Sequence, residues 1–285
     1  MLEKECIKKA YHSAILSRIV YKINEEKRYN ESNSFIENIK DILPYNSNIF
    51  KKLQKNFPDD EFIEFIDCKE TGLQSLIVKN NKEKQIYVIF RGTELELGSF
   101  DILANLLMFP KYLGEEMYVH YGYYRQLTKY NTHKKIIEKI KECLKENMDF
   151  KIVITGHSMG KILADTFTYY SIISEPQWVF NNMISNYGFA GPKAGNTNFY
   201  NYINNHVSSY NFMYKNDFAN YLFPFYDCEI PIFVLSDFWY YYQDNKNDTS
   251  LKIYKEGFGN CYINDHSTKN YINSLGKIYK LINKN

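Results

Sequence analysis

The stretch that decides the fold is Lys151-Ile-Val-Ile-Thr-Gly-His-Ser158-Met-Gly-Lys-Ile-Leu-Ala164. An apolar run typical of a strand leads into the pattern Gly156-x-Ser158-x-Gly160, and a helical pattern over Met159 to Ile172 follows. The two glycines remove side chains that would obstruct a tight turn from strand to helix. The pattern predicts a nucleophile elbow, with the hydroxyl of Ser158 held at the helix N-terminus.

A serine hydroxyl is a weak nucleophile until a base takes its proton, so a histidine partner is required. Behind an elbow of this kind the partners follow in the order serine, acid, histidine. Only His206 and His266 lie beyond the elbow. His206 falls in a predicted amphipathic helix, whereas His266 stands in Asn-Asp-His-Ser-Thr, just before the last predicted helix. We predict His266 as the base and keep His206 as the alternative.

The acid must orient the imidazole and stabilise its charged form, so it should lie in a loop at the end of a strand. Asp217 fits, because it follows the predicted strand Ser208 to Tyr214. It is therefore the predicted acid. Three other aspartates compete with it, the last disfavoured because it is next to the histidine in sequence: Asp227, Asp237 and Asp265.

The rest of the chain reads as alternating strands and helices, which predicts the α/β class. Gln85 to Arg91 is apolar over most of its length and is typical of a central buried strand. A helix is expected over Leu2 to Tyr21 and a shorter one over Phe35 to Ile42, so that residues 1–60 form a helical part packed on a single domain, 1–285. The other predicted elements are a hairpin of Glu61 to Asp67 with Leu73 to Lys79, helices over Tyr130 to Asn147, Asn196 to Asn205 and Thr268 to Ile282, and strands over Met183 to Phe189 and Ser208 to Tyr214.

Composition narrows the class of protein. With 45% hydrophobic and 24% charged residues, the 285-residue chain has the balance of a globular domain. A net charge of +2 without a basic run argues against a nucleic-acid-binding surface. The five cysteines are widely spaced, which is typical of buried thiols in a reducing compartment and not of a zinc site. Neither a signal peptide nor a membrane span is recognised, and we expect an intracellular location.

Several ordered blocks give the chain a resemblance to the class 3, fungal-type lipases of the α/β-hydrolase superfamily. That resemblance implies a mixed, centrally parallel sheet with helices on both faces, and it supports Ser158, Asp217 and His266 as the triad. The chain departs from the family pattern in two places. Lys161 replaces a small residue after the elbow, and Glu94 and Glu96 make the hinge of the implied lid unusually acidic. The matching blocks are Val88 to Thr93, Ser99 to Leu106, Val119 to Gly122, Ile154 to Gly160, Tyr187 to Asn196, Asn216-Asp217 with Pro224, and His266.

The resemblance also implies the rest of the machinery. The amides of Thr93 and Met159 would form the oxyanion hole, and the apolar run within 97–110 would be either a lid or core packing. The implied activity is serine-dependent hydrolysis of carboxylic esters, first acylglycerols, with a phospholipase A-type reaction or an inactive lipid binder as alternatives. No metal or organic cofactor is expected. The expected partner is a lipid or ester substrate, with transient contact to a membrane or lipid-droplet surface, and no nucleic acid.

Overall fold

The computed structural model describes residues 2–22, 47–92, 109–146, 149–217, 219, 230–236, 240–243 and 263–283. Within these ranges the chain forms an eight-stranded sheet in the order β1-β2-β3-β6-β7-β8-β9-β10 and a separate hairpin of β4 and β5. The strands of the large sheet are β1 (Asp60–Cys68), β2 (Leu73–Asn80), β3 (Gln85–Phe90), β6 (Lys151–His157), β7 (Ile184–Phe189), β8 (Ser208–Tyr214), β9 (Ile232–Leu235) and β10 (Tyr240–Gln243).

The centre of the sheet is parallel and both of its edges are antiparallel. β3, β6, β7, β8 and β9 pair as parallel neighbours. β1 and β2 at one edge and β10 at the other pair antiparallel. The predicted mixed, centrally parallel sheet is confirmed, and so is the predicted hairpin of the first two strands.

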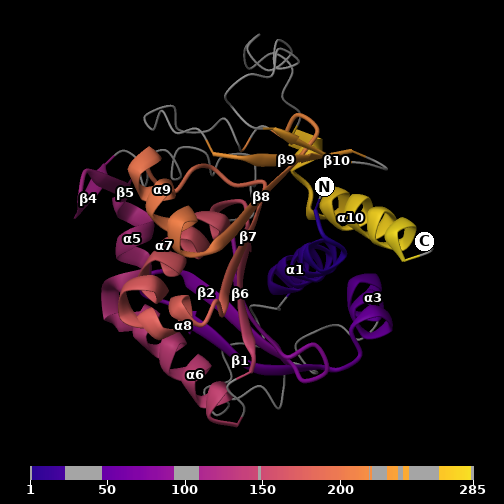
Figure 1. The fold of residues 1–285 in the computed structure, drawn as a ribbon, viewed down its shortest axis with the longest axis horizontal. Coiled ribbons are helices and arrows are strands. Elements are labelled where there is room, and N and C mark those ends of the chain that lie inside the picture. The colour runs from indigo at the N-terminus through magenta and orange to yellow at the C-terminus, as the bar shows by residue number, and fades with distance from the viewer. Residues whose placement is uncertain are drawn as a thin grey trace.

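Helices cover both faces of the sheet, as Figure 1 shows. Parallel strands need such cover because both of their faces must be kept from water. One face carries α1 (Lys4–Lys22), α3 (Asn48–Asn56) and α10 (Thr268–Ile282). The other carries α5 (Tyr121–Thr128), α6 (Thr132–Glu146), α7 (Met159–Ser174), α8 (Pro176–Phe180) and α9 (Thr197–His206).

The apolar run in β3 supplies side chains to both of these layers. Val88 and Phe90 are buried in the core beneath α5 to α9, whereas Tyr87 and Ile89 are buried beneath α1, α3 and α10. Side chains alternate between faces along a strand, so a strand covered on both sides must be apolar at every position. This is why Gln85–Phe90 reads as a continuous run without polar alternation.

The topology brings the ends of several strands to one edge of the sheet. β6 and β8 are parallel to β3, so their last residues, His157 and Tyr214, lie at the same carboxyl edge. The turn between β1 and β2 lies there too, because β1 pairs antiparallel with β2, which pairs antiparallel with β3. Loops from distant parts of the sequence therefore meet at the carboxyl edge.

Some elements differ from the sequence prediction. The hairpin of β4 (Pro110–Gly114) and β5 (Met117–His120), the helix α5 and the helix α3 were not predicted. A capping serine marks the start of α3, since the Ser47 hydroxyl accepts a hydrogen bond from the Phe50 amide. The predicted helix over Phe35 to Ile42 and all but the end of the 97–110 segment lie outside the described residues.

The N-terminal helix is buried on more than one side. Residues on several sides of α1, including Ser13, Ser17 and Tyr21, are buried. Of the helices that the structure describes, none combines the length and the apolar character needed to cross a membrane. That the chain is a single domain with residues 1–60 packed on it stays a prediction.

Candidate active site

Ser158 occupies the sharp turn between β6 and α7, with backbone angles of φ 58° and ψ −130°. Residues other than glycine rarely adopt a positive φ, and backbone strain of this kind is typical of a nucleophile elbow. The flanking glycines permit the turn: a Cβ on Gly156 would overlap the Gly160 carbonyl, and a Cβ on Gly160 would overlap the carbonyl of Phe90. The predicted strand, turn and helix are all present.

The structure brings the three predicted triad residues together. The His266 Nε2 atom lies 2.9 Å from the Ser158 Oγ atom. On the other side of the ring, Nδ1 lies 2.9 Å from Oδ1 and 3.2 Å from Oδ2 of Asp217. Because a carboxylate only accepts, Nδ1 donates to Asp217, and Nε2 is left to accept the serine proton. The geometry is that of a nucleophile, a base and an orienting acid; the catalytic roles themselves stay predictions.

Asp217 is fully buried, and its carboxylate accepts hydrogen bonds from other donors besides His266. The Ala219 amide donates to Oδ1 at 3.0 Å, and the Tyr271 hydroxyl donates to Oδ2 at 2.6 Å. Burial, followed by the charge of Asp217, raises the pKa of Tyr271 well above its usual value, so the hydroxyl keeps its proton. Tyr271, on α10, therefore holds the acid in place, a role that the sequence did not indicate.

A second histidine, His157, contacts the backbone of His266. The His157 Nε2 atom lies 2.8 Å from the backbone carbonyl of His266, so it must carry the proton. Nδ1 then accepts from the Tyr21 hydroxyl at 3.2 Å. Burial, and next the neighbouring His266, lowers the pKa of His157 well below its usual value, which keeps the ring neutral. Tyr21 at the end of α1 and His157 in the elbow thus form a buried support for the loop that carries His266.

The structure places one of the two predicted oxyanion donors. Met159 is the first residue of α7 and is buried. The first amides of a helix have no partner within it, so the Met159 amide is free to donate toward a negative oxygen beside Ser158. Thr93 lies outside the described residues, although the backbone of its neighbour Gly92 packs directly on the His157 carbonyl.

The competing residues that the structure describes lie elsewhere. His206 is exposed at the end of α9, and its Nδ1 atom lies 2.7 Å from the Tyr202 carbonyl. The Asp265 carboxylate accepts from the Asn216 amide at 3.3 Å, which braces the turn before Asp217. Asp227 and Asp237 lie outside the described residues, as do Glu94 and Glu96. The predicted preference for His266 and Asp217 agrees with this arrangement.

Lys161 is accommodated within the core. Its carbon stem fills the space left by Gly188 and Gly191, where an added Cβ would overlap it. Its ammonium lies 2.6 Å from an Asp165 carboxylate oxygen and 3.0 Å from the Tyr200 hydroxyl. The elbow keeps its tight geometry because the positive charge is paired on α7 itself, one turn further along.

Known proteins resemble this chain in sequence and in fold. The family model described as Lipase (class 3) matches residues 87–226, a range that includes the elbow and Asp217. Over this range, which is just under half of the chain, the protein is similar to the class 3 lipases. His266 and the helices α1 and α10 lie outside the matched range, so the family match does not bear on their part in the site.

Curated and solved class 3 lipases resemble this chain at modest identity. A lipase of Rhizopus niveus is 27% identical over 169 residues, which make up 57% of this chain and 40% of the relative. The solved lipase II of Rhizopus niveus has a TM-score of 0.69 at 17% identity, covering 93% of this chain and 94% of the other. A triacylglycerol lipase described as having a serine protease triad as its catalytic centre has a TM-score of 0.68 at 15% identity, covering 93% and 94%. These structures confirm the α/β-hydrolase fold.

Proposed function

We propose that this protein hydrolyses carboxylic esters through an acyl-enzyme intermediate, with acylglycerols as its substrates. One observation carries the proposal: a continuous hydrogen-bonded series from Asp217 through His266 to Ser158, placed at a strained elbow. The similarity to a solved triacylglycerol lipase supports the choice of substrate class.

Acylation begins when His266 takes the proton of Ser158 as its Oγ atom attacks the ester carbonyl. The distance of 2.9 Å between Nε2 and Oγ is already a hydrogen bond, so the transfer needs no rearrangement. Asp217 stabilises the imidazolium that forms, and its other donors hold the carboxylate facing Nδ1. His266 then gives the proton to the leaving alcohol.

The developing alkoxide is stabilised by the Met159 amide at the N-terminus of α7, with the Thr93 amide as the second proposed donor. Each such donor contributes about 3 kcal/mol to transition-state stabilisation. In deacylation His266 takes a proton from a water molecule as the water oxygen bonds to the acyl carbonyl carbon. The bond from that carbon to the Ser158 Oγ atom then breaks, and His266 returns the proton to the serine. The free acid and the resting serine result.

Contact with a lipid surface is part of the proposal. Four aromatic side chains at the carboxyl edge are exposed: Phe109 at 66%, Tyr112 at 55%, Tyr121 at 44% and Tyr118 at 38%. The hairpin bears Tyr112 and Tyr118, and Phe109 and Tyr121 flank its two ends. It is held to the loop that follows β7, since the His120 amide donates to the Ala194 carbonyl. Aromatic side chains favour the boundary between water and lipid, so this hairpin suits a surface that meets the substrate phase.

The test compares the native chain with Ser158→Ala and with Ser174→Ala, a control on the exposed end of the same helix. Hydrolysis of short soluble esters and of long-chain acylglycerol emulsions is measured, together with covalent labelling by a serine-directed phosphonate. We expect Ser158→Ala to lower kcat/KM by about 10⁴-fold or more and to abolish labelling, while Ser174→Ala behaves as the native chain.

Three outcomes separate the alternatives. Serine-dependent activity that is greatest on emulsified acylglycerols supports the lipase, whereas activity confined to phospholipid acyl chains would assign a phospholipase A-type reaction. A folded chain that neither labels nor hydrolyses any ester would instead be a lipid binder, and the proposal would fail.

A further inference from the structure

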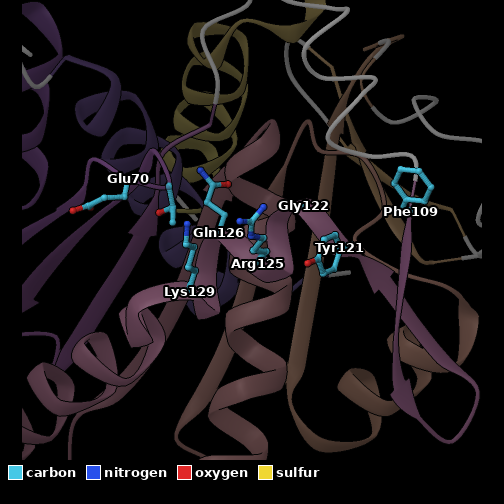
Figure 2. A pocket seen from close by; sticks show the side chains of 8 residues that line it. Glu70, Phe109, Tyr121, Gly122, Arg125, Gln126 and Lys129 are labelled. Atoms are coloured by element: carbon cyan, nitrogen blue, oxygen red, sulfur yellow. The ribbon is translucent and has the colours of Figure 1, made fainter.

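A cavity of about 410 Å³ lies between the turn that joins β1 to β2 and the first turns of α5. The two walls are in contact, since a Cβ on Gly72 would lie 3.7 Å from the Gln126 side-chain nitrogen. Figure 2 shows Arg125, Gln126 and Lys129 grouped at its centre, with Tyr121 and Phe109 to one side. The lining residues are Glu70, Thr71, Phe109, Tyr121, Gly122, Arg125, Gln126 and Lys129.

The cavity carries a positive charge. Arg125 and Lys129 lie one helical turn apart, and neither is within ion-pair distance of a carboxylate in the described part of the chain. Glu70 is the acid among the described lining residues, and its carboxylate points away from Arg125 in Figure 2. It is engaged by the Cys68 thiol at 3.6 Å. Two cations without an ion-pair partner in the described part of the chain therefore line the space, beside the amide donor of Gln126.

This combination of donors suits a phosphate group. A guanidinium presents a planar fork of N–H groups that matches phosphate oxygens, and an ammonium adds a point charge. The aromatic rim indicates where such a phosphate would come from. Phe109 and Tyr121 are both part of the lining and both exposed, and aromatic side chains of this kind lie at the level of lipid headgroups.

The cavity lies on the same edge of the sheet as the elbow, and a short series of contacts joins them. From the lining residue Thr71 the chain leads to Gln74, whose side-chain oxygen accepts from the Arg91 guanidinium at 2.6 Å. The next residue, Gly92, packs directly on the carbonyl of His157 beside Ser158. A lipid surface that reached the cavity would therefore face the candidate active site as well.

We propose that this cavity binds the phosphate-bearing headgroup of an anionic phospholipid and thereby docks the lipase on a lipid surface. The inference rests on the proposed function, which it deepens by naming the chemistry of the surface on which the enzyme works. Arg125 and Lys129 hold the phosphate, Gln126 adds a hydrogen bond, and Phe109 and Tyr121 enter the headgroup layer. Docking there turns the carboxyl edge toward the substrate.

The experiment measures binding to vesicles by co-sedimentation at low ionic strength, with Ser158→Ala as the parent so that hydrolysis does not alter the lipid. Vesicles of phosphatidylcholine alone are compared with vesicles that also contain phosphatidylglycerol. The double variant Arg125→Gln with Lys129→Gln removes the two cations. The matched control, Lys51→Gln with Lys55→Gln, removes two exposed cations at the same spacing from α3, on the opposite face of the sheet.

We expect the parent to prefer the phosphatidylglycerol vesicles and the Arg125 and Lys129 double variant to bind them about 30-fold more weakly, about fivefold for each cation. The α3 control should bind as the parent does, and added salt should weaken the parent's binding. Equal binding by the double variant and the parent would overturn the proposal, and so would an equal loss in the α3 control.

Two further arms make the result specific. Inorganic phosphate is titrated into the parent by calorimetry; saturable binding of free phosphate without binding to vesicles would assign the cavity to soluble anions and overturn the lipid docking. Hydrolysis of a soluble short-chain ester by the native chain tests the proposed function separately. A protein that binds vesicles as expected but hydrolyses no ester would refute the catalysis and leave the docking site standing.

Discussion

The replacement Tyr271→Phe tests the contribution of the Tyr271 hydroxyl, which donates a hydrogen bond to Asp217. It removes one hydroxyl and leaves the ring in place, so it deletes the hydrogen bond of 2.6 Å to Asp217 and the one of 2.9 Å from the Tyr214 amide. Asp217 is fully buried, which prevents water from replacing the lost donor. A hydrogen bond to a buried charged group contributes about 1.5–3 kcal/mol, and a neutral one such as that from the Tyr214 amide contributes about 1 kcal/mol. We expect the free energy of unfolding to fall by about 2.5–4 kcal/mol.

The activity should fall as well, because Asp217 would be less firmly aligned with His266. We expect kcat to decrease on the order of tenfold with little change in KM, since the hydroxyl touches the acid and not the substrate. Urea unfolding gives the stability, and steady-state hydrolysis of a soluble ester gives the kinetic constants. Tm should fall by about 4–7 °C.

A matched control on the same helix is Tyr279→Phe. Tyr279 stacks on Tyr11 at 5.7 Å between ring centroids, and no hydrogen bond to its hydroxyl is formed within the described residues. We expect this variant to keep native stability and native kcat. If Tyr271→Phe matched the control in both measurements, the reasoning about the buried acid would be wrong.

Three further predictions follow from the elbow and its surroundings. The free energy of unfolding of Ser158→Gly should be about 1–2 kcal/mol higher than that of Ser158→Ala, because glycine adopts a φ of 58° without strain. Equal stabilities of the two variants in urea would contradict this. Asp165→Leu should cost about 3–5 kcal/mol by stranding the buried charge of Lys161, and adding Lys161→Met should recover part of the loss; simple additivity would show that the pair is not coupled. The pKa of His157 is lowered in the folded state, so its contribution to stability is complete above the ordinary histidine pKa of about 6.5. Below that pH the free energy of unfolding falls by up to about 1.4 kcal/mol per pH unit. The variant His157→Gln should reduce this slope when unfolding is measured at several pH values, and an unchanged slope would refute the assignment.

The elbow and the candidate triad could be predicted because their signals are local or few in number. The glycines around Ser158 mark a turn that only a strand followed by a helix accommodates, and the apolar strand before it is fully buried, as expected. His266 had one competitor beyond the elbow. Asp217 stands directly after β8, whose bounds were predicted to the residue. Each inference used the chemistry of one short segment.

The supporting contacts could not be predicted because they join segments far apart in the chain. Tyr21 meets His157 across 136 residues, and Tyr271 meets Asp217 across 54. With 27 tyrosines in the chain, no single one stands out in the sequence. The position of the Lys161 side chain was hidden in part for the same reason, because besides Asp165 on its own helix it contacts the distant Tyr200 hydroxyl.

The hairpin β4-β5 was missed for a different physical reason. Its strands are short, and β4 is exposed or half-buried along its length, so it lacks the apolar alternation that marks a strand against a core. Such a surface element is stabilised by its own ladder and by backbone contacts to the loop before α9, including the bridge between Val119 and Gly195. Neither leaves a periodic trace in the sequence.

The packing of the first helix against the last one determines when this part of the core can fold during synthesis. α1 and α10 lie side by side in Figure 1, with Tyr11 against both Gly276 and Tyr279. During synthesis α1 leaves the ribosome first, but it cannot complete its packing on that face of the sheet until α10 has been synthesised. His266 emerges in the same late portion of the chain. The growing chain therefore acquires His266 and the final packing of α1 together, after every described strand of the sheet has been made.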